Sequence, residues 1–344
     1  MDASSRVAVV VNGNAKQVTE NLVGMLEEII RSGDLFVSRS LEEGQDIARR
    51  IVEGGYGTVL TGGGDGTFTQ MVTWTVKEAR RTGKNTPRFG LLRLGTGNAI
   101  AWVLGAQNKR GRGVSVDLGR LHTEGGSREL RLVEVNGVMT PFAGFGVDAL
   151  AIKHYNEMKD RFLRTPILKH FGGGALAYLA SIGGRTMPEV LFQKRGNVRI
   201  YNEGGDCVRL GTDGQPVGAP IKNGELVFDG PFRGVVLSTI PYWGFGARIF
   251  PFAEEREDRF NIRVVDIGSV DVAWNIRSIW KGTYRDDRVH DFLCEKVRLE
   301  FNAPTPLEIG GDPGGMFETC RASLAEPIQV VDYYAPPPVD TPTR

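Results

Sequence analysis

The segment Thr58-Val-Leu-Thr-Gly-Gly-Gly-Asp-Gly-Thr67 decides how the chain is interpreted, because an apolar run ends there in a glycine-rich loop. A second run, Phe89-Gly-Leu-Leu-Arg-Leu94, ends in Gly95-Thr-Gly-Asn98, and a helix-like pattern follows each loop. Glycines let backbone N–H groups approach a phosphate, and a following helix adds the positive end of its dipole. Asp65 supplies a ligand for Mg²⁺ or a base for a hydroxyl. The two loops predict a nucleoside triphosphate site and a phosphoryl transfer.

The bulk composition excludes several classes of protein. The 344 residues include 42 basic and 41 acidic side chains, and the net charge of +1 gives no argument for nucleic-acid binding. No window reaches the roughly 18 apolar residues of a spanning helix, and no signal-peptide core follows the amino terminus. Cys207, Cys294 and Cys320 are widely spaced and are expected to be reduced thiols of a cytoplasmic protein. The four histidines are dispersed and form no metal-binding spacing, so no zinc site is expected.

The pattern of elements changes near residue 118. Before it, strand-like runs at 6–11, 35–38, 58–61 and 89–94 alternate with helical spacing, which predicts an α/β nucleotide-binding domain with a parallel sheet. After it, short β-like runs between turns predict an antiparallel β-sandwich domain. The expected organisation is therefore residues 1–118, residues 119–334 and a disordered tail, 335–344. Residues 156–182 are expected to be helical.

Each motif also has a plain structural interpretation. Residues 62–67 could be a strand-to-helix turn with Asp65 as a helix cap, but four glycines in five positions exceed what a turn needs. This loop is neither a Walker A loop nor a complete dinucleotide motif, since Thr67 stands where the last glycine would be. Residues 12–16 could hold a phosphate or form an ordinary βα turn. Asp117 could be a strand-end cap, and residues 309–315 a hairpin turn.

Two stretches suit contact with a lipid interface. Residues 161–184 mix basic with apolar side chains, and residues 241–252 carry Tyr242, Trp243, Phe245, Phe250 and Phe252. Packing in a protein core is the alternative explanation for both stretches.

Taken in order, these motifs resemble the diacylglycerol kinase catalytic-domain family, which includes soluble diacylglycerol, sphingosine and ceramide kinases. The matching segments are Asn12–Lys16, Gly63–Thr67, Leu94–Asn98 and Ala143–Asp148, followed by a looser match to residues 310–312. The family's late Asp-Gly-Glu motif falls on Gly310-Gly-Asp312, where the first acid is absent and the second is one methylene shorter. Ala99 stands where the family has an Asp, and Thr69-Gln70 where it has Asn-Glu.

The resemblance implies a set of site residues. The nucleotide contacts would be Asn12, Gly13, Asn14, Ala15, Lys16, Ser40, Gly63, Gly64, Asp65, Gly66, Thr67, Phe68, Thr69, Thr96, Gly97 and Asn98. The catalytic acids would be Asp65 and Asp312, and Mg²⁺ would be held by Asp65 and Asp117.

The implied activity is ATP-dependent phosphorylation of a lipid hydroxyl, with ATP and Mg²⁺ as cofactors. The expected partner is a lipid substrate at a membrane surface. No nucleic-acid partner is expected, and the sequence leaves a homodimer open. The expected location is the cytoplasm, with peripheral membrane association. A NAD kinase shares the Gly-Gly-Asp-Gly-Thr loop, and a non-catalytic nucleotide- or lipid-binding regulator would also fit. Diacylglycerol, a sphingoid base and ceramide remain open as acceptors.

Overall fold

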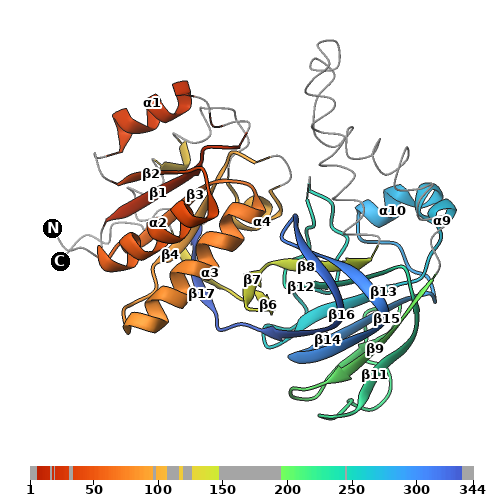
Figure 1. Cartoon of the computed structure of the whole chain (residues 1–344). Coiled ribbons are helices and arrows are strands. Elements are labelled where there is room, and N and C mark those ends of the chain that lie inside the picture. Colours follow the sequence, from red (N-terminus) through yellow and green to blue (C-terminus); the bar gives the residue numbers. More distant parts are fainter. Residues whose placement is uncertain are drawn as a thin grey trace, which may run out of the picture. The chain divides into compact units, whose positions relative to one another are not determined.

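The structure is a computed structural model of the chain (Figure 1), and it describes residues 6–15, 18, 20–30, 34–95, 98–106, 116–118, 126–146, 195–244 and 246–334. The chain divides into two compact units, residues 1–131 with 326–344 and residues 132–325. The segment 156–182 and the tail 335–344, for which a helix and disorder are expected, lie outside the described residues.

The first unit is an α/β unit built on a six-stranded sheet ordered β2-β1-β3-β4-β17-β5. All neighbours in this sheet pair in parallel except β17 and β5, which confirms the predicted fold class. Its strands are β1 (Val7–Asn12), β2 (Leu35–Ser38), β3 (Thr58–Gly63), β4 (Arg88–Arg93), β5 (Gly126–Leu130) and β17 (Ile328–Asp332). Its helices are α1 (Glu20–Ile29), α2 (Leu41–Glu53), α3 (Asp65–Thr82) and α4 (Ala99–Leu104).

Local sequence explains why these elements form and how they pack. Residues 8–11 of β1 are alanine and valines and are almost completely buried, as expected of a strand covered on both faces. The hydroxyl of Ser40 caps α2 by accepting the N–H of Glu43 at 3.2 Å. Helices α2 and α3 lie side by side (Figure 1), and a Cβ at Gly44 of α2 would overlap the Trp74 ring of α3. Gly44 therefore permits the close approach of the two helices.

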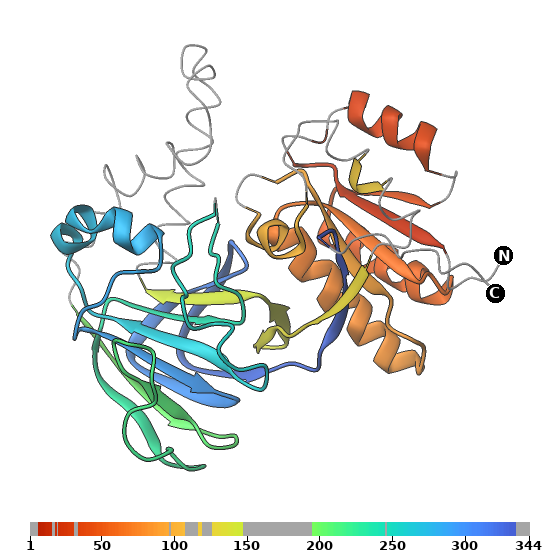
Figure 2. The ribbon, with the colours of Figure 1, turned by 180° about the vertical axis from the view of Figure 1, so that it is seen from behind.

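The boundary of the first unit differs from the predicted one at residue 118. Strand β5 belongs to the α/β sheet, and β17 returns from the far end of the sequence to lie between β4 and β5. Figure 2 shows β17 in blue beside the orange strands of the amino-terminal part. Strand β17 pairs with β5 over five residue pairs, from Ile328↔Leu130 to Asp332↔Gly126. The difference arises because the order of strands in a sheet depends on pairing between segments that are distant in sequence.

The second unit is a large antiparallel sheet, which confirms the other half of the predicted fold class. Its strands are β6 (Val133–Val135), β7 (Val138–Thr140), β8 (Phe142–Gly146), β9 (Gly196–Asn202), β10 (Val208–Leu210), β11 (Leu226–Phe232), β12 (Gly234–Ser238), β13 (Phe260–Val265), β14 (Val289–Cys294), β15 (Lys296–Ile309) and β16 (Asp312–Leu324). Two short helices, α9 (Ser269–Trp274) and α10 (Ile276–Trp280), connect β13 with β14.

Strand β15 joins two parts of this sheet, the pair β9–β11 and the row of strands from β8 to β10. Its first half pairs with β9 and its last residues pair with β8, with a register shift between Glu300 and Thr305. The Phe301 ring lies 4.9 Å from that of Phe145 and 5.3 Å from that of Phe232, measured between centroids. Strands from both parts contribute to one apolar core. Packing also accounts for part of the aromatic segment 241–252, since Phe250 and Phe252 are buried, and Phe252 belongs to a separate small apolar cluster with Leu210 and Leu293.

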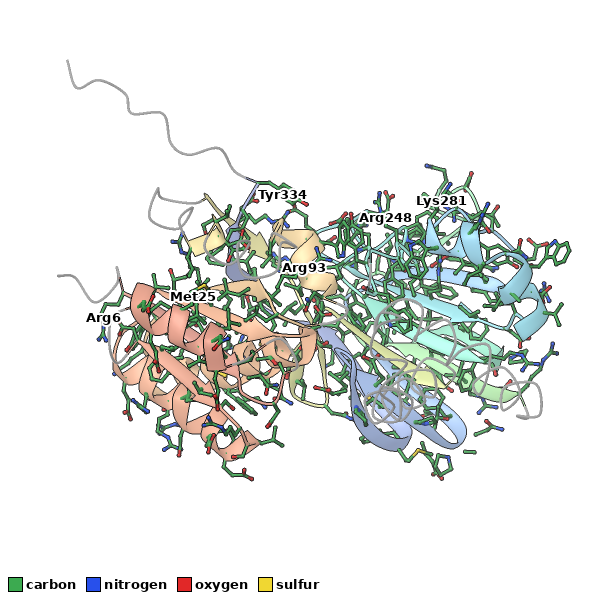
Figure 3. The ribbon with its side chains drawn as sticks, turned by 90° about the horizontal axis from the view of Figure 1, so that it is seen from above. Arg6, Met25, Arg93, Arg248, Lys281 and Tyr334 are labelled. Atoms are coloured by element: carbon green, nitrogen blue, oxygen red, sulfur yellow. A yellow bond between two sulfur atoms is a disulfide. The ribbon has the colours of Figure 1, made fainter. Side chains whose placement is uncertain are left out.

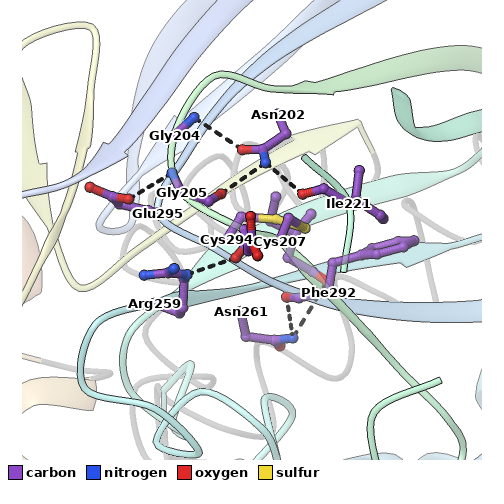
Figure 4. Close-up of a disulfide and its surroundings, with 12 residues drawn as sticks. Asn202, Gly204, Gly205, Cys207, Ile221, Arg259, Asn261, Phe292, Cys294 and Glu295 are labelled. Carbon is purple, nitrogen blue, oxygen red and sulfur yellow. Dashed lines mark hydrogen bonds between the residues drawn. A yellow bond between two sulfur atoms is a disulfide. The ribbon is translucent and has the colours of Figure 1, made fainter. Parts of the chain in front are cut away.

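The state of two cysteines also differs from the prediction. Cys207 and Cys294 form a disulfide, whereas reduced thiols were expected (Figure 4). Their separation of 87 residues gives no signal in the sequence, but β10 pairs with β14 and brings the two Cα atoms to 4.7 Å. Cys320 is a buried free thiol, and burial raises its pKa to about 11.

Among the described residues, no helix combines the length and the apolarity needed to cross a bilayer.

Candidate functional site

The two glycine-rich loops lie side by side at one edge of the α/β sheet. Strands β3 and β4 are parallel neighbours, with Gly63 paired to Arg93, so both loops leave the sheet at the same carboxyl edge. This is the edge at which open parallel sheets bind ligands. A Cβ added to Gly95 would overlap the Cα of Gly64 and would lie 2.7 Å from the carbonyl oxygen of Gly63. The loops are therefore in contact, as their placement in the sequence predicts.

The glycines of the first loop differ in what surrounds them, and this explains each glycine differently. A Cβ at Gly62 would come within 2.8 Å of the Val11 side chain, and one at Gly63 would overlap Thr67. Close packing therefore requires both of these residues to be small. Gly64 is the N-cap of α3, and a Cβ there would meet nothing within 4 Å among the residues that the structure describes. The space over Gly64 at the start of an 18-residue helix is thus open to a ligand.

Asp65 connects the two loops through its carboxylate. Its side chain is buried, and it accepts the N–H of Ala99 at 2.8 Å and that of Ile100 at 3.0 Å. A carboxylate at the first turn of α4 also interacts favourably with the helix dipole. Asp65 therefore caps α4 across the loop.

Asn98 precedes α4 in an unusual conformation. Its φ is 47°, its side chain is buried, and its amide donates to the carbonyl of Gly95 at 2.8 Å. Its Oδ1 atom has no hydrogen-bond partner within the part of the chain that the structure describes. The predicted contacts Lys16, Thr96 and Gly97 lie outside the described residues.

The Asn-led loop after β1 is hydrogen-bonded to the glycine loop. The Asn12 amide donates to the Thr67 hydroxyl at 3.2 Å, while its oxygen accepts the N–H of Asn14 at 2.9 Å. The Asn14 side chain donates to the carbonyl of Arg39 at 2.8 Å, and Ala15 closes the turn by donating to the carbonyl of Asn12 at 2.9 Å. Gly13 lies against Arg39, whose Cγ atom would be 3.1 Å from an added Cβ.

A cavity of about 190 Å³ lies beside these loops in the first unit. Four predicted residues line it: Asn12, Asn14, Ser40 and Thr67. The residues that the sequence did not indicate are Val10, Ser38, Arg39, Leu41, Gln70, Met71 and Trp74. Arg39 is exposed and adds a cation to the rim. Its place directly before Ser40, in the turn after β2, is the signal that could have identified it.

Two predicted nucleotide contacts have buried side chains. Phe68 is fully buried, and its ring packs edge-on against that of Phe89 at 6.5 Å. Thr69 is 2 % exposed, and its carbonyl accepts the hydroxyl of Thr73 at 2.7 Å. Both side chains belong to the packing of α3 against the sheet. Gly66, between Asp65 and Thr67 in the first turn of α3, is partly exposed.

Arg93 is a further cation at this edge of the sheet. It is the last residue of β4 and is labelled in Figure 3. Its guanidinium lies 4.9 Å from the centre of the Trp102 ring of α4. Burial lowers the pKa of Arg93, and the charge of Asp65 opposes that change. An arginine directly before Leu94-Gly95 could have been recognised in the sequence as a candidate partner of an anion.

The other predicted acids have different surroundings. Asp117 is buried in the first unit, and its charge adds to the effect of burial in raising the pKa of Tyr333. Asp312 is exposed at the start of β16 and belongs to the second unit, beside a turn with positive φ at Gly310 and Gly311. The N–H of Gly311 donates to the carboxylate of Glu308, a buried acid that the sequence did not indicate.

A metal site made by protein side chains alone is not found in the described ranges. They contain no group of three or more His, Cys, Asp or Glu side chains arranged to hold an ion.

Comparison with known proteins agrees with the resemblance inferred from the motifs. Residues 6–132 match the model of the diacylglycerol kinase catalytic domain, which confirms the resemblance over that part of the chain. No curated protein sequence matches the chain.

Solved structures extend the likeness in fold to nearly the whole chain. Two structures from Bacillus anthracis str. Sterne, each described as a "putative diacylglycerol kinase", are 14 % identical to it, with TM-scores of 0.62 and 0.63. The matches cover 95 % and 96 % of this chain, and they cover 97 % and 98 % of the two Bacillus anthracis chains. A third, described as a diacylglycerol kinase from the same strain, is 11 % identical with a TM-score of 0.59, and 96 % of this chain and 97 % of that chain are covered.

Proposed function

We propose that this chain is an ATP-dependent lipid kinase that transfers a phosphoryl group to the hydroxyl of a membrane lipid such as diacylglycerol or a sphingoid or ceramide lipid. The match of residues 6–132 to the diacylglycerol kinase catalytic domain supports a kinase with a nucleotide substrate. The observation that carries the proposal is the open space over Gly64, between loops that are otherwise closely packed. Packing gives no reason for a glycine there, whereas a bound phosphate does.

The first turn of α3 would hold the triphosphate. The first N–H groups of a helix have no partner within it, and here they face the loop of Gly63 and Gly64. The cavity beside Asn12 and Thr67 would take the rest of the nucleotide, with Arg39 near the anionic groups. Positioned N–H groups and cations lower the barrier to phosphoryl transfer because they stabilise the charge that develops on the phosphoryl oxygens.

Mg²⁺ would be held by the carboxylate of Asp65 together with the phosphates. Protein sites for this ion typically use one or two carboxylates with substrate phosphates and water. The ion would neutralise charge on the transferred group. Asp117 remains the second predicted ligand.

Asp312 is the proposed acceptor of the proton from the lipid hydroxyl. It is the acid of the turn that resembles the family's late motif, and the bond from Gly311 to Glu308 holds that turn. Asp312→Ala should reduce transfer by about 10² or more, the effect typical of losing a general base, while Asp312→Glu should retain activity. Equal activity of Asp312→Ala on the best lipid would contradict this role.

The decisive experiment offers labelled ATP and a total lipid extract to the purified chain. The expected result is one labelled lipid, with no transfer to NAD offered as an alternative acceptor. Transfer to NAD alone would indicate a NAD kinase, and ATP binding without any transfer would indicate a regulator.

A matched pair of variants tests the nucleotide site separately. Gly64→Val places a branched side chain where the phosphate should lie, whereas Gly24→Val in α1 adds the same atoms at a position that is equally open. Calorimetric titration should show that only Gly64→Val loses ATP affinity, by at least tenfold. Equal affinity in both variants would remove the glycine loop from the site.

A further inference from the structure

We propose that helices α9 and α10 of the second unit dock on an anionic lipid bilayer. The contact is made by the α9–α10 face, defined as Val270, Ala273, Trp274, Arg277 and Lys281. The inference deepens the proposed function, because a kinase of membrane lipids must reach its acceptor at a surface. It concerns residues outside the stretches 161–184 and 241–252 that the sequence pointed to.

The five residues of the α9–α10 face lie in the helical segment that connects β13 with β14. Val270, Ala273 and Trp274 share one side of α9, and beyond the break at Asn275 the cations Arg277 and Lys281 lie about one helical turn apart in α10 and at its C-cap. All five are exposed, with Trp274 at 89 % and Val270 at 72 %. These are the two highest values among the exposed large apolar side chains of the described residues. The face is therefore apolar at its α9 end and cationic toward the end of α10.

An indole ring this exposed carries a cost in water. Tryptophan concentrates at membrane interfaces, where its ring enters the headgroup layer and its N–H remains hydrated. A ring at the surface of a bilayer regains the burial that the fold of this unit does not provide. Trp274 is accordingly the expected wedge of the contact.

The charge around the face is complementary to anionic lipid. Asp271 is the only acid in residues 269–281, and Arg288 neutralises it through an ion pair of 2.9 Å. Arg277 and Lys281 form no ion pair within the described part of the chain, so they remain available to phosphate groups. Arg248, also exposed, adds a third cation beside them, as Figure 3 shows for Arg248 and Lys281.

The face is held in place by the rest of the unit. The N–H of Arg248 donates to the carbonyl of Trp280 at 2.8 Å, and its guanidinium lies 5.7 Å from the centre of the Tyr242 ring. At the other end, the Asp271 carboxylate caps α9 by accepting the N–H of Gly268 at 3.1 Å. A fixed apolar wedge beside cations requires little ordering on binding, which favours association with a surface.

A second copy of the chain is a poorer occupant than a bilayer. In a two-fold dimer the same surface meets itself, so Arg277 and Lys281 would face their own copies. Like charges placed together at an interface disfavour the complex. Anionic headgroups provide the opposite charge to both residues.

The test measures sedimentation of the full chain with phosphatidylcholine vesicles, with and without one quarter phosphatidylglycerol. Wild type should bind the anionic vesicles and lose affinity as salt rises. Arg277→Ser and Lys281→Ser should each weaken binding by about fivefold, since a cation near an anionic membrane contributes about 1 kcal/mol. Trp274→Ser should weaken it by at least tenfold.

Matched control changes are made on exposed residues elsewhere in the β unit. Leu226→Ser on β11 and Lys296→Ser on β15 remove an apolar and a cationic side chain and should bind vesicles like wild type. Absence of wild-type binding, equal binding of all variants, or equal losses in the controls would overturn the proposal. A dimer in gel filtration that Trp274→Ser dissociates would assign the face to a second copy and would also overturn it.

Kinase assays separate this proposal from the proposed function. With a short-chain acceptor dissolved in water, the face variants should phosphorylate at the wild-type rate, because none of them lies in the nucleotide site. With vesicle substrate they should lose activity in proportion to binding. Vesicle binding through this face without any lipid phosphorylation would refute the kinase and leave the docking surface standing.

Discussion

The capping of α4 by Asp65 makes a prediction that separates architecture from catalysis. Asp65→Asn keeps the size of the side chain but replaces one acceptor oxygen by an NH₂ group. Either the Ala99 or the Ile100 N–H, which now donate at 2.8 and 3.0 Å, would then face a donor. A buried N–H left without its acceptor costs about 1–3 kcal/mol, and loss of the charge at the helix start adds about 0.5 kcal/mol.

We therefore expect α4 to open about 2 kcal/mol more easily in Asp65→Asn, which is about 30-fold. Hydrogen exchange of a peptide covering residues 98–106 measures that opening directly and does not require the two units to unfold together. Exchange in β1 should change little, because the two bonds that the substitution disturbs, to Ala99 and Ile100, lie at the start of α4.

The control is Asp46→Asn on α2. Asp46 is 64 % exposed and pairs with Arg49 at 2.9 Å, an interaction of the kind that contributes little at a surface. It should alter exchange in α4 by less than about twofold. Unchanged protection of α4 in Asp65→Asn would refute the capping argument, and loss of turnover with α4 intact would assign Asp65 a direct chemical role.

Three further predictions follow from packing, burial and covalent connectivity. Gly95→Ala should destabilise the first unit by about 1–3 kcal/mol in urea unfolding, because its Cβ has no room, whereas Gly64→Ala should change it by less than about 0.5 kcal/mol. Burial and the bond to Asp34 raise the pKa of Tyr56 to about 12, so its contribution to stability is full below about pH 10 and is lost as the pH rises toward 12. Urea midpoints between pH 8 and 12 should fall less steeply in Tyr56→Phe, and parallel curves would contradict this. Cys207→Ser and Cys294→Ser should each destabilise the second unit by about 4 kcal/mol through loss of a cross-link spanning 87 residues, and mass spectrometry of unreduced peptides that finds both thiols free would refute the bond.

Local patterns were sufficient for the elements of the first unit. The apolar runs of β1, β3 and β4 and the helical spacing behind them predict a parallel sheet, and the structure has one. The contact between the loops of Gly64 and Gly95 also follows from sequence, because parallel neighbours end at the same edge. The turn after Ile309 is likewise a hairpin, between β15 and β16.

Local sequence patterns could not predict the interactions between segments that are distant in the chain. Strand β17 completes the first sheet from residues 328–332, and the side-chain cavity near Arg39 and Trp74 forms only where α2, α3 and β1 meet. The disulfide depends on the pairing of β10 with β14, and the exposure of Trp274 depends on what the β unit leaves uncovered.

The sequence by itself determined the alternation of strands and helices, the glycine loops at strand ends and the acid between them, because these depend on residues adjacent in the chain. Only the tertiary structure decided which glycine is free of packing, that Asp65 caps α4, and which apolar side chains stay in water. These properties depend on the atoms that surround a residue in space. Gly63 and Gly64 are identical neighbours in the sequence, yet a Cβ would overlap Thr67 at the first and, among the described residues, would meet nothing within 4 Å at the second.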